Sequence, residues 1–180
     1  MNELLLRSRQ RARPVNLPLL RRIARVLLEE WLALERYELG VRLVGSAEMI
    51  RLNRQFLNHE GSTDVITFDY LSPASRSPRR AARIEGEILI CVDDAVAQAP
   101  RFHSTWQSEL VRYLVHGVLH LLGYEDSNPA ARRLMKGEEN RLLRALARSF
   151  HFQQLAASEP SASGESRINS NSSPVVNRKS

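Results

Sequence analysis

The run HGVLHLLGYED at residues 116–126 constrains the fold of this chain more than any other segment. On a helix, His116 and His120 project from one face, one turn apart. Gly123 predicts the end of that helix, and Asp126 follows shortly after it. Two imidazole nitrogens and one carboxylate suit zinc and leave a coordination position open for water or substrate. The segment therefore predicts a catalytic metal site at His116, His120 and Asp126, although nickel, iron, manganese or cobalt also accept such ligands.

A second interpretation of the same residues needs no metal. Histidines at this spacing also pack helices together, and Asp126 is a suitable N-cap for a following helix. The residue after the first histidine is Gly117, where H-E-x-x-H zinc peptidases place the glutamate that acts as general base. This glycine argues against peptidase activity.

The pattern of apolar residues elsewhere predicts an α+β protein with a small mixed sheet of about four strands and about five helices. Strands are expected at residues 2–7, 37–44, 64–70 and 84–92, and a loop at 71–83. Helices are expected after the cap Asn16, from Ser46, after the cap Asp93 or Asp94 (interrupted at Pro100), over residues 104–122, and from Pro129. We expect one domain at residues 1–156 and a disordered serine-rich tail at 157–180.

Charge and cysteine content indicate the kind of partner and the cellular compartment. The formal net charge is +6, with an excess of arginine, which fits a nucleic-acid partner or an anionic membrane surface. The single cysteine, Cys91, excludes an intrachain disulfide, favours a reducing compartment and lies in an apolar run typical of a buried filler. No apolar run is long enough to span a bilayer. We expect a cytoplasmic protein.

Three ordered motifs resemble the YbeY family of bacterial metal-dependent endoribonucleases. Residues 116–126 are similar to the family signature H-G-x-L-H-L-x-G-Y-D-H. Residues 49–68, MIRLNRQFLNHEGSTDVITF, are similar to M-x-x-L-N-x-x-Y-R-x-K-D-x-P-T-D-V-L-S-F. Residues 86–91, GEILIC, are similar to the family's G-D-I-x-I-x strand. The resemblance implies a small α+β domain with a metal site at the end of the histidine helix.

Two positions depart from the family pattern. Asp126 stands where the family usually has a third histidine, and Leu57 stands where it has an arginine associated with phosphate binding. His59 aligns with the family's lysine, so it is either a cationic phosphate contact or an ordinary turn residue. Thr63 and Asp64 match the family, and we expect them to shape the turn into the next strand.

The resemblance implies a single-strand-specific metallo-endoribonuclease, most simply zinc-dependent, acting in 16S rRNA 3′-end maturation and ribosome quality control. The implied partners are single-stranded rRNA and the small ribosomal subunit, with neither membrane nor DNA expected. The catalytic candidates are His59 and Glu125, with Glu87 a further possible base by position, and the RNA-binding candidates are Arg9, Arg11, Arg51 and Arg54. The alternatives are a metallopeptidase-like zinc hydrolase and a non-catalytic, metal-containing ribosome-associated protein.

Overall fold

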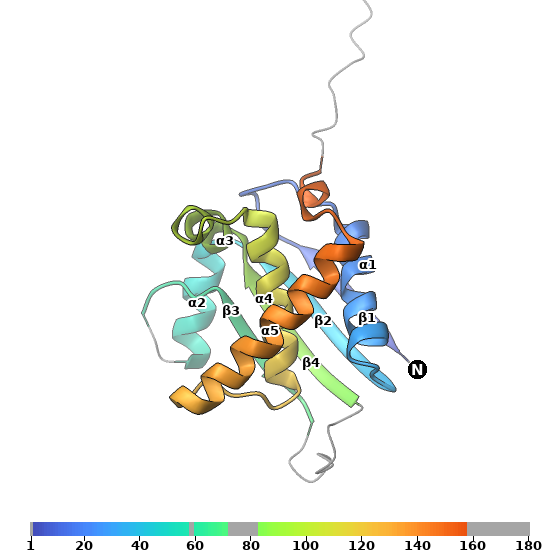
Figure 1. Ribbon diagram of the computed structural model, residues 1–180. Helices are drawn as coiled ribbons and strands as arrows, with labels where there is room; N and C mark the ends of the chain where they lie inside the picture. Colours follow the sequence, from blue (N-terminus) through green and yellow to red (C-terminus); the bar gives the residue numbers. More distant parts are fainter. Residues whose placement is uncertain (1, 58–59, 72–82, 158–180) are drawn as a thin grey trace, which may run out of the picture.

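A four-stranded mixed sheet forms the centre of the protein, as the sequence predicted. The computed structural model describes residues 2–57, 60–71 and 83–157. The strands β1 (Glu3–Ser8), β2 (Arg36–Val44), β3 (Val65–Asp69) and β4 (Arg83–Cys91) lie in the order β1-β2-β4-β3. β1, β2 and β4 are parallel, and β3 pairs antiparallel with β4. The fold is therefore α+β, with β4 in the interior of the sheet and β1 at one edge (Figure 1).

Five α-helices flank the sheet in the described part of the chain. They are α1 (Leu17–Val26), α2 (Ser46–Leu57), α3 (Val92–Gln98), α4 (Trp106–Leu121) and α5 (Pro129–Ser149). α1 continues as the π-helix η1 (Leu27–Trp31), and the short 3₁₀ helices η3 (Ala99–Phe102) and η4 (Phe152–Leu155) follow α3 and α5. Figure 1 shows α5 crossing in front of α4, which itself lies against the sheet. α4 is thus enclosed between β4 and α5.

Two glycines allow α4 to approach the sheet closely. A Cβ atom at Gly117 would lie 2.7 Å from Cγ2 of Ile88, and one at Gly86 would lie 2.9 Å from Cδ2 of Leu121. Both distances are shorter than carbon atoms tolerate, so larger residues there would push the helix away from β4. This close packing fixes the position of the histidine-bearing helix.

The opposite face of the sheet has a smaller core beneath α2. Met49 and Leu52 of that helix pack with Ile66, Leu89 and Cys91 from the strands. Cys91 is a buried free thiol, as its apolar surroundings in the sequence predicted.

Helix capping agrees with the sequence at one helix and differs at another. Asn16 caps α1, because its side chain accepts a hydrogen bond from the Leu19 amide at 3.1 Å. The expected cap of α3 by Asp93 or Asp94 is wrong, because β4 runs directly into the helix and both residues lie in its first turn. Their carboxylates instead accept hydrogen bonds from the Ser46 amide at 2.6 Å and from the Ser62 hydroxyl at 2.7 Å.

Some expectations fall outside the described residues. These are the role of His59, most of the loop at 71–83 and the tail from residue 158 onward. Within the described chain, Ala157 still donates its amide to the Pro14 carbonyl at 3.0 Å. Among the described helices, none is both long and apolar enough to cross a bilayer.

Candidate metal centre

The end of α4 turns the chain back over the helix. Gly123 adopts a φ of +86°, which glycine reaches without a steric penalty. Its amide donates to the His120 carbonyl at 2.9 Å, and the Tyr124 amide donates to the Leu119 carbonyl at 3.0 Å. These two bonds form a Schellman motif. They stop the helix directly after His120, so the chain can return toward the histidines.

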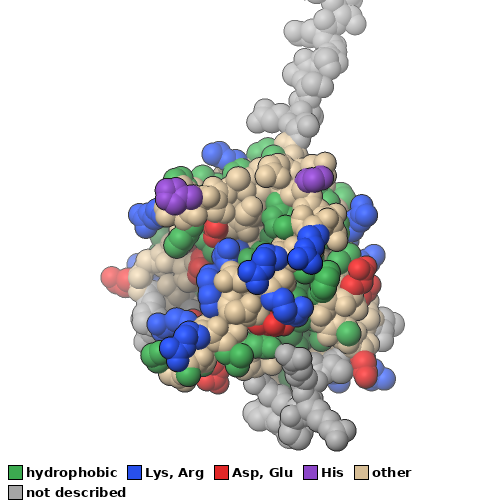
Figure 2. Space-filling model, in the orientation of Figure 1, with side chains coloured by type: hydrophobic (Ala, Val, Ile, Leu, Met, Phe, Trp, Pro, Cys, Tyr) green, Lys and Arg blue, Asp and Glu red, His purple; other side chains and the backbone are tan. Residues whose placement is uncertain are grey.

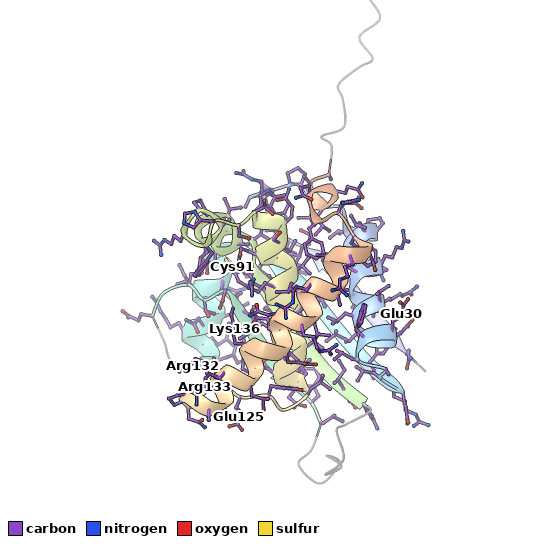
Figure 3. All side chains as sticks on the ribbon, viewed as in Figure 1. Glu30, Cys91, Glu125, Arg132, Arg133 and Lys136 are labelled. Atoms are coloured by element: carbon purple, nitrogen blue, oxygen red, sulfur yellow. The ribbon has the colours of Figure 1, made fainter. Side chains whose placement is uncertain are left out.

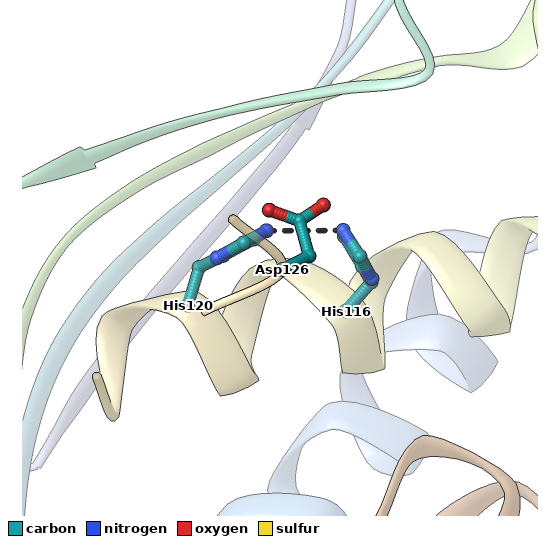
Figure 4. A group of neighbouring side chains, drawn as sticks. All are labelled: His116, His120 and Asp126. Atoms are coloured by element: carbon teal, nitrogen blue, oxygen red, sulfur yellow. Dashed lines mark hydrogen bonds between the residues drawn. The ribbon is translucent and has the colours of Figure 1, made fainter. Parts of the chain in front are cut away.

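The return places three potential ligands together. The Nε2 atoms of His116 and His120 lie 3.0 Å apart, and their rings are inclined by 87°. Ligand atoms of His116, His120 and Asp126 all lie within 4.8 Å of one another. In Figure 4 the Asp126 carboxylate lies over the gap between the two imidazoles. The residues that the sequence suggested as ligands therefore share one location.

The outer nitrogen of each ring has an acceptor that fixes its tautomer. His116 Nδ1 lies 3.0 Å from Oε2 of Glu139, and His120 Nδ1 lies 3.0 Å from the Tyr124 carbonyl oxygen. A carbonyl or an ionised carboxylate only accepts hydrogen bonds, so both Nδ1 atoms must donate. In the neutral rings the proton then sits on Nδ1, and the two Nε2 lone pairs face each other.

Facing lone pairs are a suitable arrangement for a cation. Two nitrogen ligands of one tetrahedral zinc lie roughly 3.3 Å apart, close to the 3.0 Å between the Nε2 atoms of His116 and His120. Burial, followed by the neighbouring His116, lowers the pKa of His120 below its ordinary value. His120 is therefore neutral near pH 7, as a metal ligand must be.

Glu139 supports the histidine pair from α5. It is only 3% exposed, and besides His116 it accepts hydrogen bonds from Arg112 at 2.5 Å and Lys136 at 2.8 Å. Burial alone would raise the pKa of this carboxyl group, but the bonds from His116, Lys136 and Arg112 lower it to about 2. Glu139 is thus a permanent carboxylate that orients His116, in the way outer carboxylates orient zinc-bound histidines.

The N-terminus of α5 shows whether Asp126 is the helix cap or is free to act as a metal ligand. The residue that caps α5 is Asn128, whose Oδ1 accepts hydrogen bonds from Ala130 at 3.1 Å and Ala131 at 2.9 Å. Asp126 is not the cap, so its carboxylate is available to the histidines. Its backbone carbonyl accepts a hydrogen bond from Arg132 at 3.1 Å, which ties the returning loop to α5.

A cavity of about 470 Å³, here called the α4 cavity, opens beside the candidate ligands. His116 and Asp126 line it together with Asp64, and three basic residues, Arg112, Arg132 and Lys136, also line it. Figure 2 shows that Lys and Arg side chains gather over α5. The exposed basic residues of this helix are Arg132, Arg133, Lys136, Arg141, Arg144 and Arg148.

The structure does not bring the two acidic base candidates to the α4 cavity. Glu125 is exposed, accepts a hydrogen bond from Ser127 at 3.2 Å and borders a separate hollow near the start of α5 (Figure 3). Glu87 projects from the face of β4 opposite α4 and pairs with Arg42 at 2.6 Å. Neither carboxylate is among the described residues that line the cavity.

The four arginines suggested as RNA ligands also lie elsewhere. Arg9 and Arg11 follow β1, and Arg51 and Arg54 are exposed on α2. None of them lines the α4 cavity in the described part of the chain. Leu57 is the last residue of α2, and its side chain is outside the described part of the structure.

Sequence reasoning missed the residues that α5 contributes. Arg132 and Lys136 are four residues apart, and Glu139 and Asn140 lie three and four residues after Lys136, so all of them share one helix face. That spacing was visible in the sequence, but nothing local showed that this face packs against the histidine helix.

Fold and site together define an α+β protein with a histidine- and carboxylate-lined centre suited to a divalent metal. Residues 7–147 match the family described as Endoribonuclease YbeY. The chain belongs to the YbeY family.

Individual relatives agree with this assignment. The chain is 40% identical over 102 residues to "Endoribonuclease YbeY" of Chlorobium phaeovibrioides, covering 57% of this chain and 64% of that protein. It is 38% identical over 111 residues to the protein of the same name from Chlorobium luteolum, covering 62% and 75% of the two chains. The first of these matches spans slightly less than two thirds of its relative.

A solved structure shares the fold. The solution structure of TM1509 from Thermotoga maritima superposes with a TM-score of 0.58 at 23% identity, covering 88% of this chain and 99% of that one. At this identity the similarity concerns the fold alone.

Proposed function

We propose that this protein is a metal-dependent endoribonuclease that cleaves single-stranded RNA. The observation that supports this most strongly is the pair of imidazoles held with their Nε2 atoms 3.0 Å apart beside Asp126, where His116 and Asp126 line the α4 cavity. The name of the family and of its relatives gives endoribonuclease activity, and the proposal adds the metal and the preference for single strands.

His116, His120 and Asp126 would hold the metal, and zinc suits two imidazoles and one carboxylate. A bound divalent ion supplies charge stabilisation at a phosphoryl oxygen and a water of lowered pKa. The chain supplies the orientation: Glu139 and the Tyr124 carbonyl fix the two rings, and Asp126 adds the carboxylate.

Basic residues beside the ligands would bind the RNA backbone. Arg132 is exposed where the loop of Asp126 meets α5, and Arg112 reaches the cavity from the histidine helix. Phosphates next to the cleaved bond require such cations. We favour these residues and the basic surface of α5 over the four arginines outside the cavity.

The biological substrate proposed is the 3′ region of 16S rRNA, bound on the small ribosomal subunit in the cytoplasm. The net charge of +6 supports an RNA-rich partner, and the single buried cysteine suits a reducing compartment. Ribosome quality control would follow from the same cleavage activity. We expect neither a membrane nor DNA as a partner.

Two alternatives remain for the experiment to separate. A peptidase of the H-E-x-x-H type would need its glutamate at position 117, but Gly117 packs directly on Ile88 with no room for a side chain. A non-catalytic ribosome-associated protein is favoured by Leu57, which stands where the family has its arginine.

Chelation tests the proposal. Zinc-loaded protein is incubated with a labelled single-stranded fragment of 16S rRNA, with and without a strong chelator, and thermal unfolding is recorded on the same samples. The proposal predicts cleavage that chelation abolishes while the protein stays folded. Binding of RNA without cleavage at any metal concentration would support the non-catalytic alternative, and unfolding on chelation would indicate a structural metal.

A further inference from the structure

The α4 cavity extends well beyond the three metal ligands. Its volume of about 470 Å³ falls within the range of about 300–1,000 Å³ typical of small-molecule sites. Gln98 and Phe102, from α3 and η3, line the cavity, as do Lys136 and Asn140 from α5. There is therefore room for an organic group beside a metal and its phosphate.

Phe102 is an aromatic side chain that the protein leaves uncovered. It is 62% exposed, although it borders the cavity. The backbone around it is well held, since the His103 amide donates to the Pro100 carbonyl at 3.3 Å and the Ser104 amide donates to the Ala99 carbonyl at 2.9 Å. A phenyl ring at the edge of a cavity offers a flat surface on which another ring can stack.

Polar groups without full partners accompany this ring. In the described part of the chain, no hydrogen bond involves the Gln98 side chain, and Asn140 uses only its Oδ1, which accepts from Arg112 at 3.3 Å. Tyr113 also lines the cavity, and its buried hydroxyl has no hydrogen-bond partner among the described residues. Buried polar groups normally have a hydrogen-bond partner. A ligand or an ordered water in the cavity would supply one to the Tyr113 hydroxyl.

We propose that the part of the α4 cavity between η3 and α5 binds one unpaired nucleobase of the RNA strand. The base stacks on Phe102, and the amides of Gln98 and Asn140 hydrogen-bond to its edge. Stacking on an aromatic side chain combined with edge hydrogen bonds is how proteins read single-stranded RNA. His116 and Asp126 line the same cavity, so a nucleotide bound here has its phosphate within reach of the metal ligands.

This inference rests on the proposed function and explains a preference for single strands. A base paired in a duplex cannot leave its stack to enter the cavity without a cost in free energy. A base in a single strand enters freely. The subsite would thus select unpaired nucleotides without any contact that recognises a whole sequence.

Binding of RNA with one missing base tests the subsite. A short single-stranded RNA and a set of matched oligonucleotides, each abasic at one position, are titrated with zinc-loaded protein in the cold, and a gel confirms that the RNA stays intact. The variants are Phe102→Ala and Phe102→Trp. The control is Tyr70→Ala, because Tyr70 is similarly exposed at 59% but borders the hollow around Glu87, on the other face of the sheet.

The subsite predicts that wild-type protein loses about 5- to 100-fold in affinity when one particular base is absent. The affinity of Phe102→Ala for intact RNA should be lower by a similar factor. Its affinity for the RNA that lacks this base should fall little further, because the substitution and the missing base remove the same contact. Phe102→Trp and Tyr70→Ala should behave as wild type. The double variant Gln98→Ala/Asn140→Ala should bind intact RNA more weakly but the abasic RNA as wild type does.

Unchanged affinity of Phe102→Ala, or an undiminished abasic penalty in that variant, would overturn the subsite while leaving the endoribonuclease proposal intact. Wild-type protein that neither binds nor cleaves any of these RNAs would overturn both. The two failures are therefore distinguishable within one set of titrations.

Discussion

The Oε2 atom of Glu139 lies 3.0 Å from Nδ1 of His116 and links α5 to the histidine helix. Because this carboxylate also binds Arg112 and Lys136, it holds its own position as well as that of the imidazole. The proposed metal site therefore depends on the packing of α5 as much as on the signature segment itself.

Glu139→Gln should weaken zinc binding about 10- to 100-fold, the usual effect of removing a carboxylate that orients a histidine ligand. Competition with a chromophoric chelator measures this. Glu138→Gln is the matched control, because Glu138 binds Arg141 at 2.7 and 2.9 Å and does not line the α4 cavity. Equal zinc affinity in the two variants would contradict the orienting role.

Substitutions at Asp126 and Asn128 should separate metal binding from helix capping. Asp126→Asn should lower zinc affinity by more than the about 10- to 100-fold typical of an orienting residue, because it removes a charged ligand. Asn128→Ala should keep the zinc but lower the free energy of unfolding by about 1 kcal/mol, since it removes the bonds to Ala130 and Ala131.

Asp126→His supplies the complementary variant, because it restores the third ligand typical of the family. It should bind zinc at least as well as wild type. Zinc affinity that is insensitive to both changes at position 126 would exclude Asp126 as a ligand.

Gly117→Ala should destabilise the protein by about 1–3 kcal/mol, because the added methyl group would meet Cγ2 of Ile88 at 2.7 Å. Gly137→Ala is the control on α5, where a Cβ meets nothing within 4 Å. That change should stabilise the protein by up to about 1 kcal/mol through helix propensity. Denaturant unfolding of both variants measures the difference, and equal shifts would contradict the close packing of α4 on β4.

Arg132→Gln should weaken RNA binding and reduce the slope of log affinity against log salt by about 0.7, the value for one phosphate contact to a single strand. Arg9 does not line the α4 cavity, so Arg9→Gln should leave both quantities unchanged. Titrations at several salt concentrations test this. The opposite result would move the RNA path to the segment after β1.

The sequence predicted what is encoded locally. His116 and His120 share a helix face by spacing alone, Gly123 marks the turn, and Asp126 follows within reach, so the candidate ligands could be named without tertiary information. The strand pattern around β4 was equally local, and four strands form where they were expected.

Long-range packing could not be predicted from local sequence patterns. Glu139 and Lys136 reach the site only because α5 crosses α4, and no pattern within either helix specifies that crossing. The same limit explains why Glu87 was considered as a base. Its place in β4 was predicted, but its side chain lies on the face of the strand away from the histidines. The cap expected at Asp93 or Asp94 was wrong for a related reason, since β4 leads into α3 without a loop.

The most direct test of the central claim compares wild-type protein with the double variant His116→Ala/His120→Ala, both exposed to zinc and assayed on labelled single-stranded rRNA at moderate salt. The account predicts that the wild type binds one zinc and cleaves the RNA. The double variant should stay folded, because both side chains are only half-buried, but it should lose the zinc and the cleavage. Cleavage that persists in the double variant, or a wild-type protein that binds zinc and RNA without cleaving, would contradict it.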